Sequence, residues 1–136
     1  MPKLKQFLVA FVSFVTLDFL WLGFVIKDFN FRHLAEIGRI ENGVFQMQFA
    51  PALATYVLMA FAVPFYVIPR LPQRGSLVNT FLIGAPMGLI IYGVFDMTNL
   101  AILKNYPLAF VPPDIAWGTL VFGIVTLITA KSMGTE

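Results

Sequence analysis

The sequence predicts an all-α integral membrane protein, a transmembrane bundle of four helices in a single domain that covers residues 1–136. Of the 136 residues, 59% are hydrophobic and 12% are charged, which is more apolar surface than a soluble domain of this length can bury. Four apolar segments also approach the roughly 20 residues that a helix needs to cross a bilayer. These segments are residues 7–26, 49–68, 77–103 and 114–130.

The first segment follows two lysines, as the apolar part of a signal peptide does. It is longer than such a part, contains Asp18, and has no small-x-small cleavage site after it. We therefore expect a retained first span. Residues 27–44 form the one substantial polar loop, and Leu34 and Ile37 share a face there while the charged residues lie elsewhere. This spacing predicts a short amphipathic helix on the bilayer surface.

Prolines divide the rest of the chain. Pro72 marks a tight connection between the second and third spans, and Pro107 follows the third. Pro112 and Pro113 lie where the fourth helix begins, a place that tolerates proline. The fourth segment is short, so we expect it to include Asp114 in its first turn.

The two halves of the chain resemble each other. The stretch "LDFLWLGFVIKDF" in the first span is similar to "FDMTNLAILKNY" in the third, and "APALATYVL" is similar to "PPDIAWGTL". These similarities suggest two helical hairpins related by a pseudo-twofold axis, an arrangement known in membrane proteins. Chance alignment of apolar segments is the alternative.

Orientation follows from the Lys and Arg residues on each side of the membrane. The termini and the second loop hold five, against four in the first and third loops. The nine residues are Lys3, Lys5, Arg70, Arg74 and Lys131, then Lys27, Arg32, Arg39 and Lys104. This weak bias places both termini in the cytoplasm.

The third span contains a stripe of small and polar residues. Gly84, Gly88, Tyr92, Asp96 and Asn99 recur at helical spacing on one face. A pair of glycines four residues apart allows another helix backbone to approach closely. We therefore expect this face, with Asp96, to point into the bundle.

Two further aspartates stand at comparable depth. Asp18 shares a helix face with Trp21, and a carboxylate near the bilayer centre costs about 2.5–3.5 kcal/mol on insertion scales. Asp114, with Trp117 one turn later, lies in the first turn of the fourth span, where the helix dipole favours a negative charge. That capping role is the simpler interpretation of Asp114.

The topology brings these groups to the same half of the membrane, because the first and third spans run in parallel and the fourth begins where the third ends. We expect a polar pocket that opens away from the termini. Its candidate binding residues are Asp18, Trp21, Tyr92, Asp96, Asn99, Asp114 and Trp117. The alternative is structural: a protonated aspartate that bonds to a neighbouring helix stabilises a bundle by about 0.6–2 kcal/mol.

Composition excludes several chemistries. The chain has no cysteine and one histidine, so we expect no metal site of the usual kind and no cofactor. It has no Gly-rich phosphate loop, and no basic cluster that would bind nucleic acid. Carboxyl chemistry remains: proton exchange, binding of a cation or amine, or acid–base assistance. No catalytic residue can be assigned.

The stretches "TLDFLWLGF", "YGVFDMTNLAILKNYPL" and "DIAWGT" resemble a family of small bacterial predicted membrane proteins known as domain of unknown function 2177. The similarity runs from the first span to the last. It implies a multi-span protein of the bacterial cytoplasmic membrane, and it implies no activity.

The sequence therefore predicts an intramembrane binding or translocation unit for a small solute or a proton, with the lipid bilayer as its surroundings. One four-helix bundle encloses little volume, so a transport path would require a homodimer or a partner in a membrane complex. Two alternatives stay open: a membrane-embedded enzyme that modifies lipids, and an accessory or assembly subunit whose aspartates only hold helices together.

Overall fold

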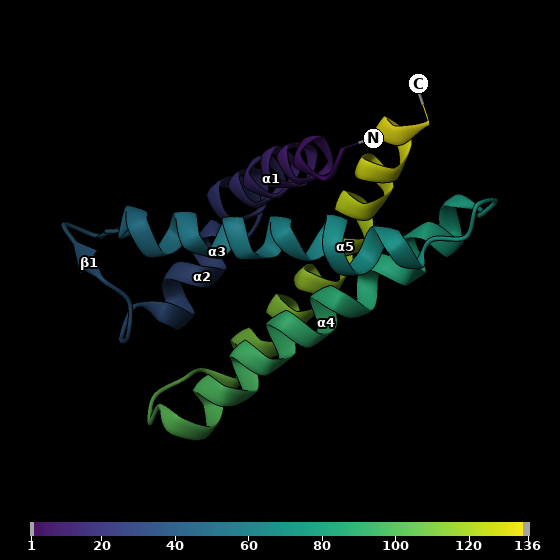
Figure 1. The fold of residues 1–136 in the computed structure, drawn as a ribbon. Helices are drawn as coiled ribbons and strands as arrows, with labels where there is room; N and C mark the ends of the chain where they lie inside the picture. The colour runs from purple at the N-terminus through teal and green to yellow at the C-terminus, as the bar shows by residue number, and fades with distance from the viewer. Residues whose placement is uncertain (1, 135–136) are drawn as a thin grey trace.

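The computed structural model describes residues 2–134, and helices form most of this range (Figure 1). In chain order the elements are α1 (Lys3–Leu20), η1 (Trp21–Val25), α2 (Lys27–Leu34), β1 (Ile40–Glu41), β2 (Val44–Phe45), α3 (Phe49–Ala62), η2 (Val63–Val67), η3 (Ile68–Arg70), α4 (Leu77–Ile102), η4 (Leu108–Phe110) and α5 (Val111–Met133). The segments η1 and η2 are π-helical, and η3 and η4 are 3₁₀-helical turns.

Four helical stretches within residues 2–134 are long and apolar enough to cross a membrane. They are Lys3–Val25, Phe49–Arg70, Leu77–Ile102 and Leu108–Met133, which confirms the all-α membrane class and the four expected spans. The fourth is longer than expected. Helix α5 begins at Val111 because Pro112 and Pro113 occupy its first turn, where a missing backbone N–H breaks no helical hydrogen bond.

The first span changes from α-helical to π-helical geometry three residues after Asp18. Helix α1 passes into η1, where the Ile26 N–H donates to the carbonyl of Trp21 at 2.9 Å. This five-residue spacing defines a π-helical turn, a feature that is frequent at functional sites. Asp18 thus lies in the last turn of regular α-helix, and Trp21 opens the wider turn.

The first loop contains the expected short helix and one unexpected element. Helix α2 covers residues 27–34, and its location on the bilayer surface stays a prediction. Strands β1 and β2 then pair as an antiparallel hairpin. Asn42 and Gly43 form its turn with φ of 51° and 75°, and an Asn-Gly pair is the preferred sequence for this left-handed turn.

The glycine stripe of α4 packs against α5, as expected. A Cβ added at Gly88 would overlap the carbonyl group of Gly118, and one at Gly84 would overlap the side chain of Thr126. Figure 1 shows α5 behind α4 along this shared stretch. The two helices therefore approach each other through backbone atoms, and α4 presents the Asp96 face to α5.

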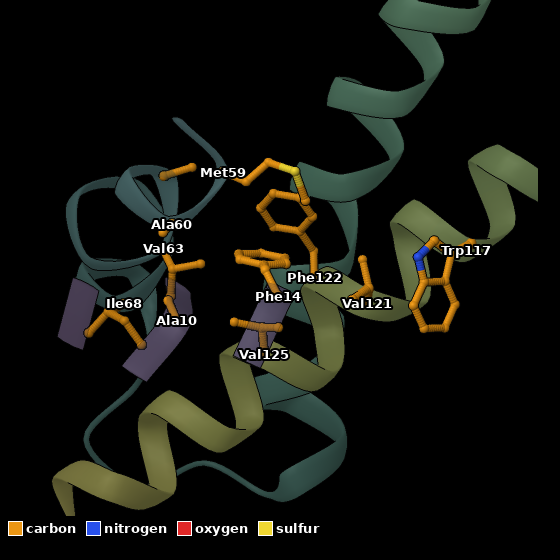
Figure 2. Packing of buried hydrophobic residues seen from close by; sticks show 11 residues of the cluster. Ala10, Phe14, Met59, Ala60, Val63, Ile68, Trp117, Val121, Phe122 and Val125 are labelled. Carbon is orange, nitrogen blue, oxygen red and sulfur yellow. The ribbon is translucent and has the colours of Figure 1, made fainter. Parts of the chain in front are cut away.

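The apolar core joins α1, the second span and α5. Its centre is the pair Phe14 and Phe122, whose ring centroids lie 4.7 Å apart (Figure 2). The buried residues of this core are Ala10, Phe14, Met59, Ala60, Ala62, Val63, Ile68, Trp117, Val121, Phe122 and Val125. In Figure 2, Trp117 lies at the edge of the group, so one of its faces is available for contacts outside the core.

Most apolar side chains on the first and third spans point outward. Only 17% of the most apolar window is buried in each of these two spans. Such a surface is incompatible with water but matches hydrocarbon. A few polar side chains, Asp18 and Asp96 among them, are buried instead, so the fold shields them from lipid. The pseudo-twofold relation between the two halves stays a prediction.

Candidate functional site

The two aspartates expected inside the bundle are both buried. Asp96 is 0% exposed and Asp18 is 5% exposed. A carboxyl group in hydrocarbon without polar partners would be strongly unfavourable. The surroundings of each carboxyl group therefore decide what it can do.

Asp18 is bonded by an indole from another span. The Trp117 Nε1 donates to Asp18 Oδ1 at 2.7 Å, and the Tyr56 hydroxyl of α3 lies near this carboxyl group. Trp21 stacks on Trp117, with centroids 4.5 Å apart and planes 3° from parallel. The stacking holds the indole in the plane from which it donates. Asp18 thus links three spans.

Asp96 has a different set of neighbours. The Tyr106 hydroxyl donates to Asp96 Oδ1 at 2.6 Å. The carboxyl group of Asp114 lies close to that of Asp96, and the two groups interact electrostatically. No N–H or hydroxyl donor among residues 2–134 reaches the buried Asp96 Oδ2. Two neighbouring carboxyl groups repel each other when both are ionised, and a proton on one of them would remove this repulsion and let that group donate to the other.

Tyr106 belongs to the short connection between α4 and α5, outside the spans. Burial, followed by its hydrogen bond to Asp96, raises the pKa of Tyr106 above its ordinary value. The hydroxyl therefore keeps its proton and stays a donor throughout the physiological pH range. Asn99, one turn after Asp96 on α4, also lies near this hydroxyl. The connection is thereby fastened to the polar face of α4.

Tyr92 lies between the two aspartate groups. Its ring rests on the backbone of Gly118, where an added Cβ would overlap the ring. Its hydroxyl is within electrostatic range of Asp18, Asp96 and Asp114. The Asp18 group and the Asp96–Asp114 pair are therefore neighbouring parts of a single polar region, which we call the carboxyl cluster. The carboxyl cluster comprises Asp18, Trp21, Tyr56, Tyr92, Asp96, Asn99, Tyr106, Asp114 and Trp117.

Local structure explains why α5 supplies two of these groups. Asp114 and Trp117 stand three residues apart near the start of α5, so their side chains share a face. Asp114 is in the first turn, where the helix dipole favours negative charge, and it also contacts Asp96. No side chain forms a capping hydrogen bond at the start of α5, so the capping role of Asp114 stays a prediction.

The seven residues expected from the sequence all enter the carboxyl cluster, while their role in binding stays a prediction. Sequence reasoning missed Tyr56 and Tyr106. Counting residues from the span ends would have found Tyr56. It lies seven residues after Phe49, where the second span starts, and Asp18 lies seven residues before Val25, where the first span ends, so the two stand at the same depth. Tyr106 had no such signal, since its place depends on how the connection folds back.

The expected outward-opening polar pocket also stays a prediction. Two surface hollows are formed by the first loop and its flanks, one beside Arg39 and Gln46 and one beside Lys27 and Phe31. Neither of these two is lined by the carboxyl cluster. No group of three or more His, Asp or Glu side chains within residues 2–134 is arranged to hold a metal ion.

Four apolar spans around buried carboxyl groups define a multi-span α-helical membrane protein. The chain belongs to the family described as "Predicted membrane protein (DUF2177)", whose model matches residues 3–131. The resemblance noted in the sequence is thereby confirmed. No curated protein and no solved structure matched the chain.

Proposed function

We propose that the carboxyl cluster binds and exchanges a proton within the membrane, and that this exchange is the basis of a binding or translocation function. The observation that carries the proposal is the contact between Asp96 and Asp114. Asp96 is fully buried, and its polar neighbours are another carboxyl group and a tyrosine. The side chains of residues 2–134 that shape the electrostatic environment of these two aspartates are Tyr106 and other aspartates, and none is a Lys or Arg.

Electrostatics explains why such a pair would hold a proton. Two negative charges roughly 4 Å apart repel by about 4 kcal/mol at an effective dielectric constant of about 20. One shared proton removes this repulsion and supplies the hydrogen bond that Asp96 Oδ2 otherwise lacks. A small cation, such as a primary amine, would satisfy the same two carboxyl groups and is the alternative occupant.

The surroundings support exchange as well as storage. Asp114 is only partly buried and stands where α5 begins, so a proton can reach the pair from the end of the bundle opposite the termini. Tyr92 and Asn99 carry groups that both donate and accept hydrogen bonds, and Tyr92 lies toward Asp18. A proton route from the pair to Asp18 would use these groups.

The location belongs to the same proposal. In a bacterial cytoplasmic membrane with both termini in the cytoplasm, the carboxyl cluster would lie in the outer half of the bilayer. Helix α1 begins beside the end of α5, where Gln6 contacts Met133, and Asp18 lies toward the other end of its span. The cluster would then face the more acidic side of an energised membrane.

Proton movement into proteoliposomes that contain a pH-sensitive dye tests the function. We expect a pH-gradient-driven signal for the wild type that D96N and D114N abolish, because an amide cannot exchange the proton. The matched control is E36Q, which changes an exposed glutamate of the first loop outside the carboxyl cluster. A signal that is equal in all four proteins, or absent from the wild type under every gradient, would contradict translocation of protons.

A further inference from the structure

A second candidate site lies where the first span meets the first loop. A hollow of about 460 Å³ opens there, which is within the size range of small-ligand sites. We call it the loop hollow; its lining residues are Leu22, Gly23, Lys27, Asp28, Phe31, Gly43, Val44 and Phe45. They come from η1, from α2 and from the hairpin, three elements at the same end of the bundle (Figure 1).

The wall of the loop hollow carries one positive and one negative charge. Lys27 and Asp28 both line it, and both side chains are exposed. No ion pair within residues 2–134 engages either of them. Neighbouring residues on a helix project in different directions, so the two charges stay separate and are both available to a ligand.

The apolar part of the wall continues into the surface that faces lipid. Phe31 and Phe45 meet edge to face with centroids 5.7 Å apart and form one side. Leu22 is 43% exposed, and the adjacent Phe24 is 71% exposed. The loop hollow therefore lies where a hydrocarbon-facing helix meets a charged loop. Phospholipid headgroups occupy this depth in a bilayer.

Two glycines leave the space open. A Cβ at Gly23 or at Gly43 would meet no atom within 4 Å. Gly43 is required by its positive φ in the hairpin turn. Gly23 is in η1 with no such backbone requirement, so its missing side chain contributes directly to the volume of the loop hollow.

We propose that the loop hollow binds a phospholipid with a primary-amine headgroup, with Lys27 facing the phosphate and Asp28 facing the ammonium. The charge pattern fits a zwitterion, because each headgroup charge meets an opposite side chain. An anionic lipid without an amine would place its negative charge near Asp28 unpaired. A free phosphate would use neither Asp28 nor the apolar wall. The glycerol and first acyl carbons would lie against Leu22 and Phe31.

Lipid retention tests the proposal independently of the carboxyl cluster. The protein is reconstituted in nanodiscs with equal amounts of phosphatidylethanolamine and phosphatidylglycerol, transferred to detergent, and analysed by native mass spectrometry for bound lipid. We expect the wild type to retain phosphatidylethanolamine in excess. D28N should reduce this excess by up to about fivefold, the range of an exposed ion pair, and K27Q should reduce retention of both lipids.

A change of shape without a change of charge provides the second test. G23L should fill the loop hollow and abolish the excess. The matched control is G93L, because a Cβ at Gly93 also meets no atom within 4 Å but belongs to α4, outside the loop hollow. The proposal is overturned if the wild type retains the two lipids in the ratio supplied. It is also overturned if D28N and G23L retain the same excess as G93L, or if phosphatidylglycerol is the lipid enriched.

Discussion

Substituting Gly88 by alanine should separate α4 from α5 and destabilise the bundle. The added Cβ would overlap the carbonyl group of Gly118 and lie 3.0 Å from the Cβ of Phe122. The main obstacle is backbone, which cannot rotate away as a long side chain can. Overpacking a dense core costs about 1–3 kcal/mol, and a helix separation of about 0.5–1 Å forfeits about a quarter to a half of each contact energy across the seam. We therefore expect a loss of about 2–3 kcal/mol.

The same substitution at Gly93 is the control, because it adds the same methyl group to the same helix in open space. Alanine is the better helix former, so G93A should be neutral or stabilise by up to about 1 kcal/mol. Unfolding in mixed micelles by increasing dodecyl sulfate, followed by circular dichroism, compares the two. If G88A and G93A unfold within about 0.5 kcal/mol of each other, α4 and α5 do not meet at this glycine and the described packing is refuted.

Two substitutions test the hydrogen bonds of the carboxyl cluster. W117F removes the donor to Asp18 but keeps an aromatic ring, and should lower the free energy of unfolding by about 1–2 kcal/mol in the same assay. The control Y66F changes an exposed tyrosine and should cost less than about 0.5 kcal/mol. Equal losses for the two variants would argue against the indole hydrogen bond. Y106F removes the donor to Asp96, so the backbone amides of residues 103–110, between α4 and α5, should exchange hydrogen faster than in Y66F. Unchanged protection would show that this hydrogen bond does not hold the connection in place.

Hydrogen bonds to Asp18 and to Asp96 support different roles. Asp18 accepts a hydrogen bond from Trp117 and lies near Tyr56, so its carboxyl group is held against two other spans. Such an arrangement stabilises a bundle whether or not a proton moves. Asp96 faces Asp114 and retains an oxygen without a donor. This incomplete satisfaction is the feature that a purely structural role does not explain.

The fold was largely predictable because the bilayer imposes simple rules on a sequence. Apolar length determined the four spans, and the spacing of Gly84 and Gly88 predicted which face of α4 another helix would approach. Parallel first and third spans then placed Asp18 and Asp96 in the same half of the membrane. These inferences depend on helix geometry alone, and so they needed no knowledge of side-chain packing.

The partners of the carboxyl groups were harder to predict. Tyr106 lies in a short connection, and its contact with Asp96 depends on the backbone path between α4 and α5, which hydropathy does not encode. Asp114 was expected in the first turn of the fourth span, where it lies, but its closeness to Asp96 depends on how α5 is rotated against α4. The hairpin, in contrast, had a readable signal in Asn42 and Gly43.

Infrared spectroscopy of the carboxyl groups tests the central claim most directly. At neutral pH, the reconstituted wild type should show the carbonyl stretch of a protonated carboxylic acid that shifts in deuterium oxide. D96N and D114N should each remove this band, because the remaining carboxyl group no longer shares its proton, whereas E36Q should keep it. A wild-type spectrum with ionised carboxylates only, or a band that survives in both D96N and D114N, would contradict a proton held between these two aspartates.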